Sequence, residues 1–137
     1  MLKKVFLDTN IVADIIDAQR VHHQSAMRLV EKLIDEAYDI CISEDMLSTL
    51  FYISKDKKGT LDFFQNVIFE DWEILHFGHT VLCNGVEIAL KETMDLEDVL
   101  QCLCAKHHGC DTIITNDTRF YDCGICIVGA EQYLVLV

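Results

Sequence analysis

The sequence contains no proline, and positive charge is scarce in it. A chain without proline offers no Pro-rich linker, which favours a compact succession of helices and strands. There are 11 Lys and Arg against 23 Asp and Glu, which gives a formal net charge of -12 over 137 residues. This balance excludes a protein that holds nucleic acid mainly through bulk positive charge. It leaves three classes open: a metal site, a surface for a basic protein partner, and a merely solubilising surface.

Long apolar runs are also absent. No stretch approaches the ~18–20 apolar residues of a membrane span, so we expect no membrane association. The N-terminus reaches the acid Asp8 before any long apolar run, and we therefore expect no signal peptide. The length suits a single domain over residues 1–137. Because neither a signal peptide nor a membrane span is expected, we expect this domain to be located in the cytoplasm.

The 7 cysteines are an odd number, and their spacing is not that of a small secreted disulfide scaffold. Cys123 and Cys126 form a CxxC that leads into an apolar run, whereas a redox pair is usually placed at a helix N-terminus. A zinc site would need further ligands, but no second clean metal-binding motif stands among the candidates Cys102, Cys104, His107, His108 and Cys110. We interpret the cysteines as free thiols of the core.

Short apolar runs alternate with longer segments of helical period along the chain. The predicted strands are Val5 to Leu7, Tyr38 to Ile42, Trp72 to Leu75, Thr112 to Thr115 and Ile125 to Val128. The predicted helices cover residues 22–36, 44–51, 60–69, 79–93 and 95–108, with Ser43 as the N-cap of the second. Strands that alternate with helices predict an α/β fold with a parallel sheet covered on both faces.

Two acids follow strands of this predicted sheet. Asp8 ends the first strand, and Asp117 follows the fourth. Either acid alone is explained by a helix cap or a turn, which Asp forms readily. In an open parallel sheet, however, ligands bind beyond the carboxyl ends of the strands. The pair therefore indicates a site at this edge of the sheet.

Asp95 and Asp98 stand three residues apart at the predicted start of a helix. They fit an N-cap and a first-turn acid, and an acid there can also project toward the strand ends. Converging carboxylates repel one another unless a cation neutralises them. Oxygen ligands suit Mg²⁺ or Mn²⁺, and the implied chemistry is metal-assisted hydrolysis of a phosphodiester.

Three short motifs, in this order, resemble those of PIN-domain proteins. They are Val5-Phe6-Leu7-Asp8-Thr9-Asn10, then Asp95-Leu96-Glu97-Asp98-Val99-Leu100-Gln101 with Ala105, then Gly109-Cys110-Asp111 through Ile114-Thr115-Asn116-Asp117. In length and spacing the chain is similar to small prokaryotic members, many of them VapC-type ribonuclease toxins paired with an antitoxin. The resemblance implies a three-layer α/β/α sandwich around a five-stranded parallel sheet of order 3-2-1-4-5.

The resemblance also implies roles for individual residues. Asp8, Asp98 and Asp117 match acids that bind the metal, which would be Mg²⁺ or Mn²⁺. Asn10 and Thr115 match polar positions that orient the site. Apart from the resemblance, we expect Thr49, Asp95 and Asn116 to support the same site.

A fourth family acid, on the helix after the second strand, is missing from this chain. Its place falls on Thr49, whose hydroxyl adds no charge. Asp45 lies one helical turn earlier on the same face and is the candidate substitute, with Glu44 a weaker one.

These features lead to two functional expectations. The first is a metal-dependent endoribonuclease that hydrolyses phosphodiester bonds in RNA, as the toxin of a pair with a basic antitoxin-like protein, and with a homodimer as a further option. The alternative is a catalytically impaired PIN domain that binds RNA or protein. The basic residues that could contact RNA are Lys55, Lys57, Lys58 and Arg119, although the interpretation as solvated loop residues is favoured for them.

Overall fold

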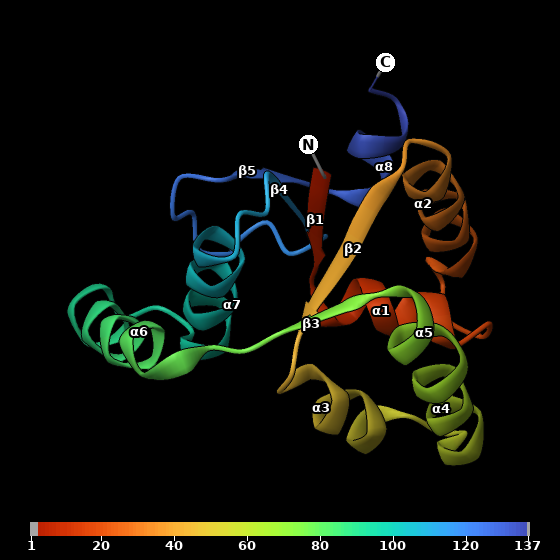
Figure 1. Ribbon diagram of the computed structural model, residues 1–137, viewed down its shortest axis with the longest axis horizontal. Coiled ribbons are helices and arrows are strands. Elements are labelled where there is room, and N and C mark those ends of the chain that lie inside the picture. Colours follow the sequence, from red (N-terminus) through yellow and green to blue (C-terminus); the bar gives the residue numbers. More distant parts are fainter. Residues whose placement is uncertain (1–2, 137) are drawn as a thin grey trace.

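The computed structural model describes residues 3–136 and contains one parallel sheet between two groups of helices (Figure 1). The strands are β1 (Lys3–Leu7), β2 (Tyr38–Ser43), β3 (Glu73–Leu75), β4 (Thr112–Ile114) and β5 (Cys126–Val128). Their order is β3-β2-β1-β4-β5, with every neighbouring pair parallel. The predicted α/β architecture and strand order are therefore confirmed.

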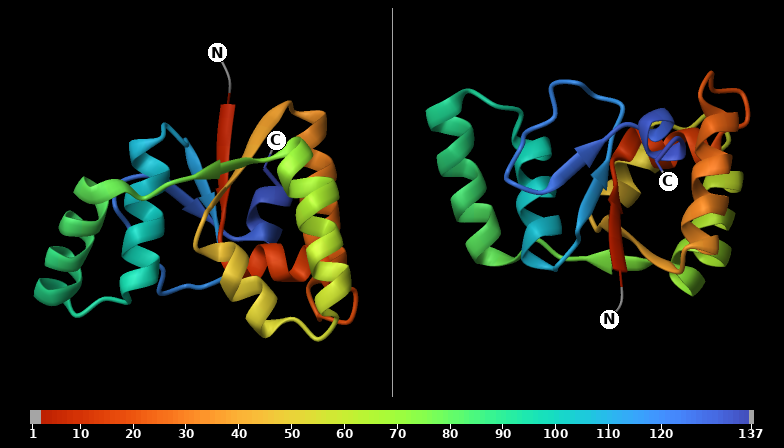
Figure 2. Two further views of the ribbon diagram at one scale, coloured as in Figure 1. Left: turned by 60° about the horizontal axis from the view of Figure 1, so that its bottom comes forward. Right: turned by 90° about the horizontal axis from the view of Figure 1, so that it is seen from above.

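The helices form layers on both faces of the sheet. They are α1 (Thr9–Ile16), α2 (His23–Asp35), α3 (Met46–Ile53), α4 (Lys57–Phe63), α5 (Phe69–Asp71), α6 (Gly78–Glu92), α7 (Leu96–His107) and α8 (Ala130–Leu134). A π-helical turn, η1 (Phe64–Ile68), joins α4 to α5. Figure 2 shows α6 and α7 on one side of the sheet, and α1, α2 and α8 on the other. None of the helices in the described range is long and apolar enough to cross a membrane.

The second part of the central strand β1 is apolar because it is covered on both faces. Val5, Phe6 and Leu7 are completely buried there. Fully covered parallel strands lose the alternation of polar and apolar residues, so they appear in the sequence as continuous apolar runs. This strand ends at Leu7, and the buried core on both sides of it therefore fixes the position of the next residue, Asp8.

Two helices were not predicted from the sequence. Most of α1 is buried, including the acid Asp14, so it lacks the polar face from which an amphipathic helix is recognised. The other, α8, has 5 residues, which is too short for a helical period to show. The predicted helix over 60–69 begins earlier, at Lys57, because the Asp56 side chain accepts a hydrogen bond from the backbone N–H of Gly59.

Ser43 is not the cap of a helix. It is the last residue of β2 and is completely buried, and its Oγ has no hydrogen-bond partner within residues 3–136. The following helix, α3, begins at Met46 after Asp45. The strand therefore continues one residue further than predicted, because the last position of β2 pairs with Leu75 of β3.

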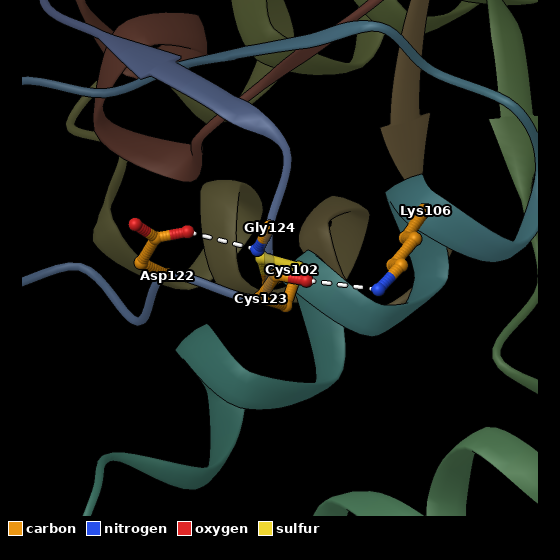
Figure 3. Close-up of a disulfide and its surroundings, with 5 residues drawn as sticks. All are labelled: Cys102, Lys106, Asp122, Cys123 and Gly124. Carbon is orange, nitrogen blue, oxygen red and sulfur yellow. Dashed lines mark hydrogen bonds between the residues drawn. A yellow bond between two sulfur atoms is a disulfide. The ribbon is translucent and has the colours of Figure 1, made fainter.

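The interpretation of every cysteine as a free thiol was wrong. Cys102 of α7 and Cys123 of the loop before β5 form a disulfide, at a sequence separation of 21 (Figure 3). Lys106 supports the same loop by donating a hydrogen bond from Nζ to the Cys123 carbonyl at 3.0 Å. Cys126, the other member of the CxxC, is exposed. The free thiols of Cys41, Cys104 and Cys110 are buried; the remaining one, Cys83, is exposed.

Candidate active site

An acidic cavity of about 530 Å³ lies beyond the carboxyl ends of β1 and β4. The chain leaves β1 for one side of the sheet and approaches β4 from the other, so loops diverge here and leave room for a ligand. The lining comes from four parts of the chain and consists of Asp8, Thr9, Asn10, Thr49, Ile53, Thr93, Met94, Asp95, Glu97, Asp98, Asp117 and Arg119. The three acids predicted to share a site thus face one cavity.

Thr115 links the two strand-end acids. Its hydroxyl donates a hydrogen bond to Asp8 Oδ2 at 2.6 Å and accepts one from the backbone N–H of Asp117 at 3.0 Å. The other carboxylate oxygen of Asp8 accepts from the backbone N–H of Thr9 at 2.7 Å. Both oxygens of Asp8 are therefore held, and its orientation is fixed before any ligand binds.

The start of α7 brings further acids to the cavity. Asp95 is the N-cap, and its Oδ1 accepts a hydrogen bond from the backbone N–H of Asp98 at 3.1 Å. The capping interpretation of Asp95 is thus confirmed. The Asp98 carboxylate accepts no hydrogen bond from residues 3–136. It projects from the first helical turn with both oxygens open to a ligand.

Three residues of this region were missed in the sequence: Thr9, Glu97 and Gln101. Glu97 Oε1 accepts hydrogen bonds from Thr9 Oγ1 at 3.3 Å and from Gln101 Nε2 at 3.2 Å. Gln101 Nε2 also donates to Thr9 Oγ1 at 3.2 Å. The signal available in the sequence was the spacing of four between Glu97 and Gln101, which places both on one face of α7.

The cavity is electrostatically unfavourable to its own acids. Burial, followed by the charges of Asp95, Asp8, Asp117 and Glu97, raises the pKa of Asp98 to about 7. Burial also raises the pKa of Asp8, although the hydrogen bonds from Thr115 and Thr9 oppose this shift. Such mutual repulsion identifies a place where a cation would be stabilised.

The donor set fits a hard divalent cation. Every candidate ligand is a carboxylate oxygen, which is the ligand that Mg²⁺ and Mn²⁺ prefer. Asp98 and Asp117 retain oxygens without a protein hydrogen bond, since only Oδ1 of Asp117 is occupied, by the backbone N–H of Arg119. As positioned, no three His, Cys, Asp or Glu side chains within residues 3–136 are grouped tightly enough to enclose an ion. Binding would therefore require the free carboxylates to turn inward.

Of the other predicted site residues, some line the cavity and others do not. Asn10 lines the cavity, and its Oδ1 accepts a hydrogen bond from Arg20 Nη2 at 3.4 Å. Thr49 lines it too, from α3. Asp45 is absent from the lining, although its charge contributes to the raised pKa of Glu97, for which burial is the larger cause.

Asn116 and the three lysines have other contacts. The Asn116 side chain accepts a hydrogen bond from the backbone N–H of Ala130 at 3.0 Å, so it serves the start of α8 and not the cavity. Lys57 Nζ donates to three backbone carbonyls at the end of α3, those of Phe51, Tyr52 and Ser54. Lys58 pairs with Asp62, and Lys55 lines a different cavity. Of the four predicted basic contacts, Arg119 lies at the acidic cavity.

Comparison with known proteins identifies the family. The PIN domain matches residues 5–125, so the chain belongs to the PIN-domain family. Ribonuclease VapC1 of Aquifex aeolicus is 35% identical over 135 residues, which cover 96% of this chain and 93% of that protein.

Solved structures agree on the fold. VapC20 of Mycobacterium tuberculosis, a toxin that cleaves the sarcin-ricin loop, superposes with a TM-score of 0.71 at 15% identity, over 88% of this chain and 95% of that chain. The DNA-bound VapBC of Salmonella typhimurium gives a TM-score of 0.68 at 24% identity, over 95% of this chain and 99% of that chain. These likenesses establish the common architecture in which the acidic cavity is placed.

Proposed function

We propose that this protein is a metal-dependent ribonuclease of the VapC type, which hydrolyses phosphodiester bonds in RNA as the toxin of a toxin–antitoxin pair. The observation that carries the proposal is the acidic cavity, where Asp8, Asp98 and Asp117 converge from three separate segments. The 35% identity to a protein named Ribonuclease VapC1 supports the same reaction.

The residues of the cavity have distinct tasks in this proposal. Asp98 and Asp117 would hold Mg²⁺ or Mn²⁺ through their free oxygens, together with Asp8. A divalent ion in such a site lowers the pKa of a bound water and offsets charge that builds on the phosphate. Thr115 keeps Asp8 and the backbone of Asp117 in fixed relation through its hydroxyl. Arg119, a cation at the same cavity, is placed to contact an RNA phosphate.

The proposal is tested by RNA cleavage with Mg²⁺ or Mn²⁺ and with EDTA. We expect cleavage by the wild-type protein to be lost in Asp8→Asn and in Asp117→Asn, since each substitution removes one charge while it preserves the shape of the side chain. Asp71→Asn, an exposed acid of α5, removes the same charge outside the cavity and is the matched control. Cleavage that survives both cavity substitutions contradicts the proposal.

A second candidate function is a PIN domain that binds RNA or protein without cutting. Thr49 favours it, because it places an uncharged hydroxyl in the lining where a further acid would strengthen metal binding. Thr49→Glu separates the two candidates. A large gain of cleavage from an inactive wild-type protein supports the binding module, whereas an active wild-type protein with little gain excludes it.

The proposed partner is an antitoxin with a basic segment. The support is the net charge of -12 together with the solved neighbours that are VapBC complexes, such as the toxin–antitoxin pair from Salmonella typhimurium. Association of a purified pair that weakens strongly with salt agrees with charge as the attraction. Association that is indifferent to salt contradicts it. Size-exclusion chromatography of the chain alone tests the proposed homodimer.

We place the protein in the cytoplasm, as a single domain over residues 1–137. That all five strands belong to one sheet supports the single domain. Because disulfides rarely persist in a reducing cytoplasm, this location predicts that Cys102 and Cys123 are thiols inside the cell. Thiol trapping of the protein in intact cells tests both the location and the redox state.

A further inference from the structure

Glu97 uses one carboxylate oxygen inside the protein and leaves the other unused. Its Oε1 accepts hydrogen bonds from Thr9 Oγ1 and Gln101 Nε2. Its Oε2 forms no hydrogen bond with the described part of the chain, yet it is not among the buried atoms that lack a partner. The free oxygen is therefore accessible, and the residue lines the acidic cavity.

The contacts of Gln101 show how firmly Glu97 is held. Gln101 is completely buried, and both protons of its Nε2 are used, one by Glu97 and one by Thr9. Its Oε1 is left buried without a partner. Turning the amide over would place that oxygen against the Glu97 carboxylate, acceptor against acceptor. The protein thus leaves a buried acceptor unsatisfied, which costs free energy, in an arrangement that orients a carboxylate.

This arrangement is the one found around ligating carboxylates. A ligand oxygen is usually left open while a neighbouring donor fixes the carboxyl group by its second oxygen. Asp8 differs, since hydrogen bonds from Thr9 and Thr115 occupy both of its oxygens. Glu97 resembles Asp117, in which Oδ1 accepts from the backbone of Arg119 and the second oxygen is free.

We propose that Glu97 is a further carboxylate ligand of the divalent cation in this cavity, held for that purpose by Thr9 and Gln101. This inference rests on the proposed function, because it assigns a ligand to the cation of the proposed nuclease. It supplies from α7 a negative charge that Thr49 does not supply from α3.

Two substitutions separate ligation from a merely structural role. In Glu97→Gln, the amide oxygen still accepts from Thr9 and Gln101, so the buried hydrogen bonds survive, but the free oxygen becomes an NH₂ that cannot bind a cation. In Glu97→Ala, both the hydrogen bonds and the free oxygen are lost. Glu70→Gln, at an exposed position of α5, is the matched control for charge.

Mn²⁺ binding, followed by electron paramagnetic resonance of the free ion, measures the effect without any turnover. We expect Glu97→Gln to raise the dissociation constant ~10-fold or more, as loss of a direct or supporting metal contact does. We expect its melting temperature in EDTA to equal or exceed that of the wild-type protein, since repulsion with the neighbouring acids is relieved. Glu70→Gln should bind Mn²⁺ as the wild-type protein does.

Three results would contradict the assignment of Glu97 as a ligand, and they differ in what they imply for the proposed nuclease. If Glu97→Gln binds Mn²⁺ with wild-type affinity while Asp98→Asn loses it, Glu97 is not a ligand, and the proposed nuclease stands without it. A loss of affinity seen with Glu97→Ala alone likewise overturns the assignment and leaves Glu97 a structural residue. If the wild-type protein neither binds Mn²⁺ nor cleaves RNA, the proposed function fails together with this inference.

Discussion

The crowding of acids at the cavity predicts how the stability of the metal-free protein depends on pH. The Asp98 carboxyl has a pKa of about 7 in the folded protein, against an ordinary value of 3.8 for an aspartate side chain in the unfolded chain. Between these two values the folded chain binds more protons than the unfolded chain. The free energy of unfolding must therefore fall as the pH rises through this window, and it should level off above pH 7.

The size of the effect follows from the same shift. One pKa unit corresponds to about 1.4 kcal/mol, so the full shift would be worth about 4 kcal/mol. Asp98 is only partly buried, and solvent screening reduces this figure; we expect about 1–2 kcal/mol between pH 5 and pH 8. The pKa values of Asp8 and Glu97 are also raised, mainly by burial, and they steepen the dependence in the same direction.

Urea unfolding in EDTA, followed by far-UV circular dichroism at both pH values, measures this difference. Asp98→Asn should stabilise the protein at pH 8 and remove about 1–2 kcal/mol of the pH dependence, because an amide stays neutral throughout. Asp71→Asn, an exposed acid of α5, controls for net charge. If Asp98→Asn leaves the pH dependence of the wild-type protein unchanged, the carboxylates do not repel one another as the structure implies, and the reasoning is refuted.

Four further predictions concern single contacts. Reduction of the Cys102–Cys123 disulfide should lower the free energy of unfolding by ~3 kcal/mol, from the loop entropy of its 21-residue separation, and Cys123→Ser should no longer respond to reductant. Thr115→Val should destabilise the protein by about 1–3 kcal/mol in urea unfolding, because a buried carboxylate and a backbone N–H each lose a partner; a wild-type midpoint would contradict the described hydrogen bonds. Lys57→Met should leave RNA cleavage intact, since its Nζ binds backbone carbonyls of α3. Arg119→Ala should raise the KM for RNA roughly tenfold, as the loss of one phosphate contact of about 1.4 kcal/mol would. If Lys57→Met impairs RNA cleavage and Arg119→Ala does not, RNA binds beside Lys57 and not at Arg119.

The sheet was predictable because each of its strands contains buried apolar positions. A strand covered on both faces must be apolar throughout, and this property belongs to the local sequence, so Val5 to Leu7 was recognised without knowledge of its neighbours. The strand-end acids followed from the sheet, since parallel strands end at one edge. Asp8 and Asp117 were thus expected from the topology of the sheet, whereas Asp98 was assigned through the resemblance of its motif to PIN-domain proteins.

The features that were missed depend on contacts between segments far apart in the chain. The role of Glu97 appears only when Thr9, 88 residues earlier, is placed beside it. The partner of Cys102 could not be predicted because Cys123 is 21 residues away, and nothing in the local sequence shows that it lies opposite α7. Lys57 was a candidate for RNA contact because the sequence does not show that the carbonyls at the end of α3 accept hydrogen bonds from its Nζ.

The disulfide also has a consequence for the covalent connectivity of the cavity. It encloses the segment from Cys102 to Cys123 in a ring, and this segment contains β4 and Asp117. A single cut by a protease anywhere within this ring leaves both fragments attached to one another through sulfur. A nicked molecule would migrate as one species on a non-reducing gel and as two on a reducing gel. In its oxidised form, the protein can therefore be cleaved next to Asp117 without the loss of any part of its acidic cavity.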